Sequence, residues 1–110
     1  MIFVTGPMFS GKREYVRQAL GWDEEELQRR AVWDVQELVP AANPERLADE
    51  LAKKDVVIAS EIGGGVVPAD PVQRRKREEA GKLACLLAQR ADTVVRVCCG
   101  IPQLLKGAWP

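Results

Sequence analysis

The chain of 110 residues is long enough for one domain with a buried core and too short for two. Its 16 basic and 16 acidic residues cancel, so no global field attracts nucleic acid or an anionic membrane, and we expect neither as a partner. No apolar run approaches the roughly 18 residues that a membrane span requires. No basic leader precedes the apolar residues 2–4, so the sequence predicts a cytosolic protein.

Four short apolar runs rich in Val and Ile are typical of strands buried on both faces of a parallel sheet. They cover residues 1–5, 31–35 (or 31–39 in a longer form), 56–60 and 93–99. Helical patterns lie between them, at residues 12–20 and directly after Asp23, Asn43 and Asp70, three residue types that cap helix N-termini. The longest helix follows Asp70, and its expected inner face comprises Val72, Ala80, Leu83, Ala84, Leu87 and Ala91.

Alternating strands and helices indicate an α/β fold. We predict a single three-layer, P-loop NTPase-like domain over residues 1–110, with a mostly parallel sheet of about four to five strands. Ligands of such sheets bind beyond the carboxyl ends of the strands. Three segments fall there: residues 6–11, the turn after Val35, and residues 61–68.

The first of these segments matches the pattern G-x-x-x-x-G-K, the phosphate-binding loop up to its lysine. Glycines let backbone N–H groups converge on phosphate oxygens, and the lysine ammonium reaches the β- and γ-phosphates. The segment follows a predicted strand and opens a predicted helix, as this motif requires. The sequence therefore predicts a site for a purine nucleoside triphosphate, ATP or GTP, formed by Gly6, Pro7, Met8, Phe9, Ser10, Gly11, Lys12 and Arg13.

Arg13 stands where this motif normally has a serine or threonine whose hydroxyl binds Mg²⁺. Arginine has no acceptor atom and cannot bind a cation. Either Mg²⁺ is held by other oxygens and water, or the guanidinium supplies the positive charge, or the loop binds phosphate without transferring it. We expect binding of Mg²⁺ to be weakened by Arg13.

Residues 61–68 read E-I-G-G-G-V-V-P. Three glycines after a strand allow close approach of a ligand to the backbone, although an ordinary turn explains them equally well. Together with the loop at residues 6–13, this segment resembles the adenosylcobinamide kinase/adenosylcobinamide-phosphate guanylyltransferases of cobalamin biosynthesis, whose pattern is E-V-G-x-G-I-V-P. The resemblance continues through Arg74, Arg77, Glu78, Gly81, Ala91 and Asp92 to Gly100, Leu105, Lys106 and Gly107, and covers about two-thirds of the chain.

The resemblance implies a cobinamide kinase, with Lys12 and Glu61 as catalytic residues, a corrinoid substrate and a homo-oligomer, a trimer in this family. It also implies that Asp34 is the acidic residue of a second nucleotide-site strand and a candidate metal ligand. The chain departs from the family in lacking the histidine that accepts the guanylyl group, since it contains no histidine. An Asn-Gln pair of the family's long helix is replaced by Ala84 and Cys85.

Other features have structural interpretations. The three cysteines, Cys85, Cys98 and Cys99, lack metal-ligand or disulfide spacing, so we expect buried thiols. Trp33 is interpreted as a core residue. The basic run at residues 74–77 is either a solvated helix face or a source of arginines that meet a phosphate or a carboxylate across a subunit boundary.

Three functional hypotheses follow. The first is a kinase-like phosphotransferase that phosphorylates adenosylcobinamide without the histidine-dependent guanylyltransferase step. The second is a non-catalytic nucleotide-binding accessory or regulatory protein of the same fold. The third is a corrinoid-binding or scaffold protein that kept only the fold.

Overall fold

The computed structural model describes residues 1–62 and 70–110, which form an α/β sandwich around one sheet. The strands are β1 (Ile2–Gly6), β2 (Ala31–Val32), β3 (Val56–Ser60), β4 (Thr93–Cys98) and β5 (Ile101–Lys106). The helices are α1 (Lys12–Leu20), α2 (Glu24–Arg30), α3 (Pro44–Leu51) and α4 (Pro71–Arg90), with a short 3₁₀ turn, η1, at Val35–Leu38.

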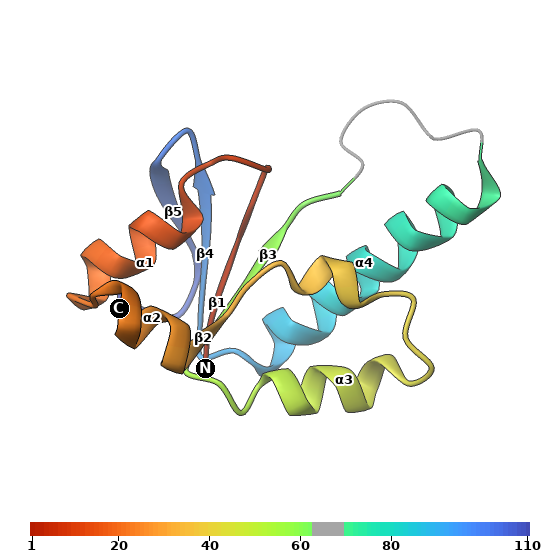
Figure 1. Ribbon diagram of the computed structural model, residues 1–110, viewed down its shortest axis with the longest axis horizontal. Coiled ribbons are helices and arrows are strands. Elements are labelled where there is room, and N and C mark those ends of the chain that lie inside the picture. The colour runs from red at the N-terminus through yellow and green to blue at the C-terminus, as the bar shows by residue number, and fades with distance from the viewer. Residues whose placement is uncertain (63–69) are drawn as a thin grey trace.

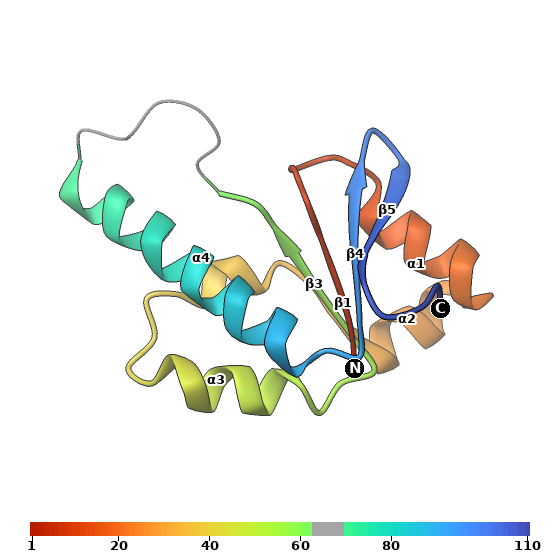
Figure 2. The same ribbon diagram turned by 180° about the vertical axis from the view of Figure 1, so that it is seen from behind.

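The sheet has the strand order β2-β3-β1-β4-β5. β1 lies in the middle and pairs in parallel with β3 and β4, so the loops that follow β1 and β3 open at one edge. Figures 1 and 2 show α1 and α2 on one face of the sheet and α3 and α4 on the other. The predicted three-layer, mostly parallel P-loop NTPase-like architecture is confirmed.

Each face of the sheet has its own apolar core because successive strand residues point to opposite faces. Phe3 and Val57 pack toward Leu83 and Leu87 on the α3–α4 side. Val4, Ile58 and Val95 pack toward Val16 and Leu27 on the α1–α2 side. All five residues of β3 are buried, which explains why the strand reads as a continuous apolar run instead of an alternating one.

The predicted helix caps are present. Backbone N–H groups in the first turn donate to Asp23 Oδ1 at 2.8 Å, to Asn43 Oδ1 at 3.1 Å and to Asp70 Oδ1 at 2.9 Å. Each cap satisfies one of the donors that a helix N-terminus leaves without a partner. The boundaries of α2, α3 and α4 are thus encoded locally in the sequence.

One strand prediction was wrong in extent, and one strand was not predicted. The strand expected at residues 31–35 ends at Val32, because Asp34 adopts a left-handed conformation with φ of 56° and the chain turns into η1. Val35 and Val39 are buried by η1 and its flank and not by a strand. β5 was not assigned from the sequence. It is a mostly exposed edge strand that returns antiparallel to β4 through a tight turn at Cys99 and Gly100.

Several burial predictions were also wrong. Cys85 lies on the exposed side of α4, Cys99 is exposed in the turn before β5, and Cys98 is half-buried. Val72 is 74% exposed, because the first turn of α4 extends beyond the sheet, as Figure 1 shows. The glycines and Pro68 of the predicted 61–68 segment fall outside the described residues. Within residues 1–62 and 70–110, no helix is long and apolar enough to cross a membrane.

Gly6 is one of two described glycines, with Gly107, at which a Cβ atom would clash with a backbone carbonyl oxygen. It has φ of +150°, and a Cβ atom there would lie 2.1 Å from the carbonyl oxygen of Val97.

We expect Gly6→Ala to lower the free energy of unfolding by more than about 2 kcal/mol, because the backbone of either β1 or β4 must shift. Gly81→Ala is the control: described atoms leave its Cβ position open, so this helix-interior change should stabilise the protein by about 0.5–1 kcal/mol. Urea denaturation of both variants measures the difference, and equal stabilities would contradict the expectation.

Candidate phosphate-binding site

The loop between β1 and α1 has a backbone conformation that turns sharply at three residues. Gly6, Phe9 and Gly11 have φ values of 150°, 56° and 86°. Phe9 has a left-handed conformation that residues other than glycine rarely adopt, and its side chain is 99% exposed. The loop thereby wraps around the N-terminus of α1, where backbone N–H groups and the helix dipole favour an anion.

Backbone hydrogen bonds fix this loop to both strands beside β1. Glu61 N donates to Gly6 O at 2.8 Å, and Gly100 N donates to Ser10 O at 2.8 Å. The first bond reaches the loop from the end of β3, and the second from the turn between β4 and β5. The loop is therefore held at both of its ends by backbone groups.

Lys12 folds back over the loop that precedes it. Its Nζ donates to Pro7 O at 2.6 Å and lies 3.4 Å from Ser10 Oγ, and the residue is only 8% exposed. Burial lowers the pKa of the Lys12 ammonium below its ordinary value, and the carboxylates of Asp34 and Glu61 oppose this shift. The loop thus encloses a desolvated positive charge that an anionic ligand would stabilise.

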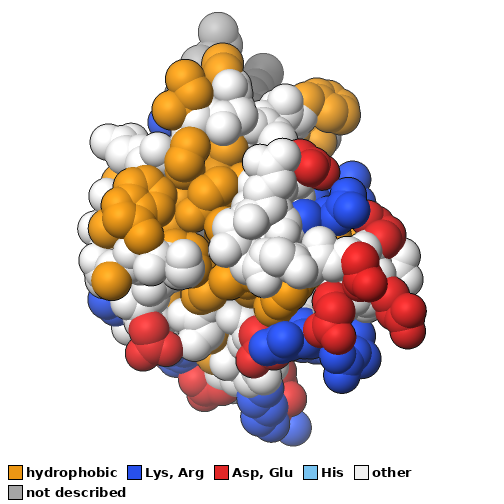
Figure 3. All heavy atoms as spheres, turned by 90° about the vertical axis from the view of Figure 1, so that its left-hand side faces the viewer, with side chains coloured by type: hydrophobic (Ala, Val, Ile, Leu, Met, Phe, Trp, Pro, Cys, Tyr) orange, Lys and Arg blue, Asp and Glu red, His pale blue; other side chains and the backbone are white. Residues whose placement is uncertain are grey.

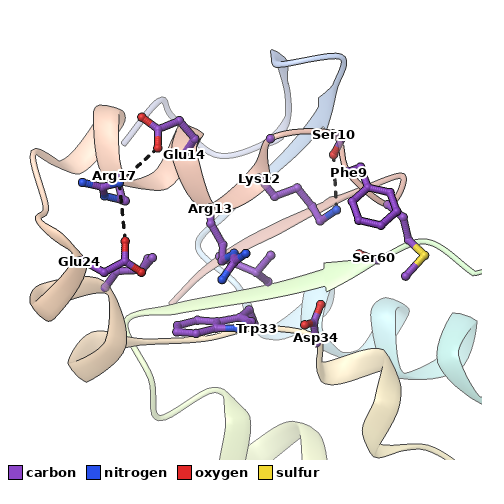
Figure 4. A pocket seen from close by; sticks show the side chains of 14 residues that line it. Phe9, Ser10, Lys12, Arg13, Glu14, Arg17, Glu24, Trp33, Asp34 and Ser60 are labelled. Atoms are coloured by element: carbon purple, nitrogen blue, oxygen red, sulfur yellow. Dashed lines mark hydrogen bonds and ion pairs between the residues drawn. The ribbon is translucent and has the colours of Figure 1, made fainter.

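A cavity of about 460 Å³ opens beside this loop on the α1–α2 side of the sheet. Figure 4 shows side chains from four parts of the chain around it. Those that bear on its chemistry are Ser10, Lys12, Arg13, Trp33, Asp34 and Ser60. The structure therefore brings the predicted loop residues and the predicted acidic residue Asp34 to one cavity.

Trp33 differs from its sequence interpretation as a core residue. It is half-buried, packs partly against the core on the α1–α2 side, and forms a wall of the cavity. The guanidinium carbon of Arg13 lies over its ring, 5.4 Å from the centroid. An arginine and an indole at this separation attract each other through a cation–π interaction.

Glu61 lies at the same edge of the sheet but in a different environment. Arg96 Nε and Nη2 donate to its two carboxylate oxygens at 2.6 and 3.1 Å. Glu61 lines a second, smaller cavity of about 170 Å³ on the α4 side, which shares Ser60 and the end of β3 with the first. The two predicted carboxylates, Asp34 and Glu61, therefore stand on opposite sides of β3.

Sequence reasoning missed two residues of this region. Arg96 is a charged residue inside the apolar run of β4, and Gln36 is a polar residue inside the apolar run after β2. Gln36 is 3% exposed and its Oε1 accepts a hydrogen bond from Ser60 N at 2.9 Å, which fixes the end of β3 to η1. A buried polar residue must find a partner, so the interruption of each apolar run was the available signal.

The basic run at residues 74–77 makes at least one contact within the chain. Lys76 Nζ lies 2.8 Å from Glu37 Oε2, which ties α4 to η1. Half-exposed and exposed side chains make up the run, as expected for a solvated helix face.

Comparison with known proteins shows the family. Residues 21–105 match the family described as cobinamide kinase / cobinamide phosphate guanyltransferase. The chain belongs to this family. A stretch of 58 residues is also 38% identical to the bifunctional adenosylcobalamin biosynthesis protein CobP of Pseudomonas aeruginosa, covering 53% of this chain and 34% of that protein.

The family match begins after α1 and does not include the loop at residues 6–13. The assignment of that loop as a phosphate site thus depends on its own motif and geometry, independently of the family. Family membership does not restore the guanylyl-accepting histidine, because this chain has none.

We predict that Lys12 lowers stability and raises affinity for phosphate. Lys12→Met should stabilise the free protein at pH 7, because it removes a charge whose desolvation is unfavourable. The same substitution should weaken nucleotide binding by ten- to a hundredfold, because one charge-assisted hydrogen bond contributes about 1.5–3 kcal/mol. The pKa of Lys12 is lower in the folded protein than in the unfolded chain. Wild type should therefore gain stability as the pH rises from the folded-state pKa to the unfolded-state pKa, and its stability should approach that of Lys12→Met.

Thermal melting from pH 7 to 10.5 and titration with ATP test both parts. Lys54→Met is the matched control, because Lys54 is an exposed lysine that does not line this cavity. A Lys12→Met protein that melts below wild type while binding ATP normally would contradict the assignment.

Proposed function

We propose that this chain binds a purine nucleoside triphosphate at residues 6–13 and transfers its γ-phosphoryl group to a hydroxyl group of a cobinamide. The observation that carries the proposal is the buried Lys12 inside a backbone loop at the carboxyl edge of the sheet, in a member of a family described as cobinamide kinase / cobinamide phosphate guanyltransferase. ATP and GTP fit the proposal equally. The histidine-dependent guanylyl transfer is not part of it.

In the proposed reaction, the bond between the γ-phosphorus and the bridging β-phosphate oxygen breaks, and the acceptor oxygen forms a new bond to phosphorus. The products are a nucleoside diphosphate and a phosphate ester, and the hydroxyl proton leaves to solvent. Lys12 would hold the β- and γ-phosphate oxygens and stabilise the charge of the transferred group. The loop N–H groups would fix its position.

Two carboxylates are candidates for orienting the acceptor hydroxyl. Glu61 is held in one orientation by Arg96, so it offers a preorganised acceptor at the end of β3. Asp34 lines the same cavity as Lys12 and is a candidate for holding water there. Because Ser60 borders both cavities, an acceptor on the α4 side of β3 would meet a nucleotide on the α1 side at this residue.

A non-catalytic nucleotide-binding role is the second candidate. It is favoured by the pairing of both Glu61 oxygens with Arg96, because an acceptor hydroxyl would have to compete with the guanidinium for them. The short match to CobP, 34% of that protein, also allows a chain that keeps one part of a larger activity.

The experiment that separates these candidates measures binding and turnover on the same preparation. Calorimetric titration with ATP and GTP tests nucleotide binding. Incubation with cobinamide and each nucleotide, followed by chromatography of the corrinoid and the nucleotide, tests phosphoryl transfer. We expect cobinamide phosphate and nucleoside diphosphate in equal amounts, with at least a hundredfold loss of rate in Lys12→Met and no loss in Lys54→Met.

Binding without turnover would support the accessory role, and the absence of binding would leave only the fold in common with the family. Glu61→Gln distinguishes the carboxylate's roles: a reduced rate with unchanged nucleotide affinity would indicate a role at the acceptor.

We also propose that the protein forms a homo-oligomer, a trimer by family resemblance, through the outer face of β5. Figure 3 shows hydrophobic side chains gathered on one part of the surface, beside charged groups. Ile101, Leu105 and Trp109 are 70%, 53% and 55% exposed on and just after this edge strand. Light scattering should give a multiple of the 12.2 kDa chain mass, and Leu105→Glu should give the monomer.

A further inference from the structure

Arg13 occupies a place in the phosphate site that this motif normally gives to a metal-binding hydroxyl. The side chain leaves the first turn of α1 and enters the 460 Å³ cavity between Lys12 and Trp33, as Figure 4 shows. Its guanidinium lies over the Trp33 ring at 5.4 Å, and among the described residues it has no ion-pair partner.

The residues around the cavity do not fit a divalent cation. Within residues 1–62 and 70–110, no three His, Cys, Asp or Glu side chains come together as a metal-binding group. Of the two carboxylates that act on the charge of Lys12, Asp34 lines this cavity, whereas Glu61 is already paired with Arg96 on the other side of β3. A guanidinium in the same cavity repels a cation and attracts phosphate.

We infer that Arg13, held by Trp33, is a phosphate ligand that takes the place of a divalent metal, so that this site binds a nucleoside triphosphate or an inorganic oligophosphate without Mg²⁺. The inference depends on the proposed nucleotide site at residues 6–13 and names the form of ligand that this site takes. Lys12 and Arg13 then contact the phosphates from adjacent positions, one as a point charge and one as a planar donor fork.

Trp33 is the positioning residue in this arrangement. Arg13 is exposed at the start of a helix, where a free arginine side chain would sample many rotamers in solvent. Stacking on the indole restricts it to the cavity before a ligand binds, which reduces the ordering that binding requires. A ligand that draws the guanidinium toward phosphate must also change the surroundings of the indole ring, so Trp33 fluorescence reports the contact.

The test uses ATP and inorganic tripolyphosphate as probes, each titrated in EDTA and in excess Mg²⁺, with calorimetry and tryptophan fluorescence as readouts. We expect wild type to bind both probes with dissociation constants that differ less than threefold between the two conditions.

Arg13→Ser should bind at least tenfold more weakly in EDTA and regain affinity with Mg²⁺. Arg13→Lys should retain part of the binding in EDTA, because it keeps the charge and loses the fork. Trp33→Leu should weaken binding in EDTA and abolish the ligand-dependent fluorescence change.

Arg46→Ser is the matched control, because Arg46 is an exposed arginine of α3, on the other face of the sheet, and does not line this cavity. It should bind both probes like wild type. A loss in Arg46→Ser equal to that in Arg13→Ser would overturn the specific role of Arg13. Thermal melting of each variant confirms that it is folded.

Wild-type binding that requires Mg²⁺ by tenfold or more, and that Arg13→Ser leaves unchanged, would overturn the inference and leave the proposed nucleotide site intact. Failure of wild type to bind ATP or tripolyphosphate in either condition would overturn the nucleotide site itself.

Discussion

The contact of the Gly6 backbone with β4 is the constraint from which the site is built. The carbonyl oxygen of Val97 lies where a Cβ atom of residue 6 would stand, so β1 and β4 can approach only because that residue is glycine. From Gly6 the chain turns away from the sheet, and the hydrogen bonds from Glu61 N and Gly100 N fix the two ends of the loop. Both donors follow strands beside the loop. Sheet register therefore determines loop position, and the loop determines where Lys12 points.

The same geometry explains why a stable loop carries an unfavourable charge. Lys12 Nζ is satisfied by Pro7 O and lies near Ser10 Oγ, which compensates for part of its lost hydration. Its lowered pKa shows that the compensation is incomplete. Phosphate oxygens would supply the missing negative charge, so the binding energy of the ligand and the instability of the free site have one origin. If Lys12 binds phosphate as proposed, ligand affinity and stability oppose each other at this residue.

Local signals in the sequence were sufficient for most of the fold. Buried runs of Val and Ile marked β1, β3 and β4, and Asp23, Asn43 and Asp70 marked three helix starts, because strand burial and helix capping depend on residues close in sequence. β5 was missed because a mostly exposed edge strand containing Pro102 lacks a continuous apolar run. The end of β2 was missed because apolar residues that pack from a 3₁₀ turn look like a strand. The cysteines were misplaced because composition alone does not say which face of α4, or which turn, a residue occupies.

At the site, the sequence predicted the phosphate-binding loop and showed that Arg13 replaces its usual hydroxyl residue. Contacts between residues far apart in the sequence became visible only in the structure. Trp33 is twenty positions from Arg13 in sequence, and Arg96 is thirty-five from Glu61, so neither pair can be read from spacing. Each pair joins an arginine to a group that holds it in one orientation, on opposite sides of β3. Arg13 lies over the indole of Trp33, so its N–H donors remain available to a ligand. Arg96 donates hydrogen bonds to the Glu61 carboxylate. The larger cavity, on the α1 side, is lined by the cationic side chains of Lys12 and Arg13, whereas the described lining of the smaller cavity, on the α4 side, has one charged side chain, Glu61, which is paired with Arg96. This asymmetry favours a polyphosphate on the first side and a less charged acceptor on the second.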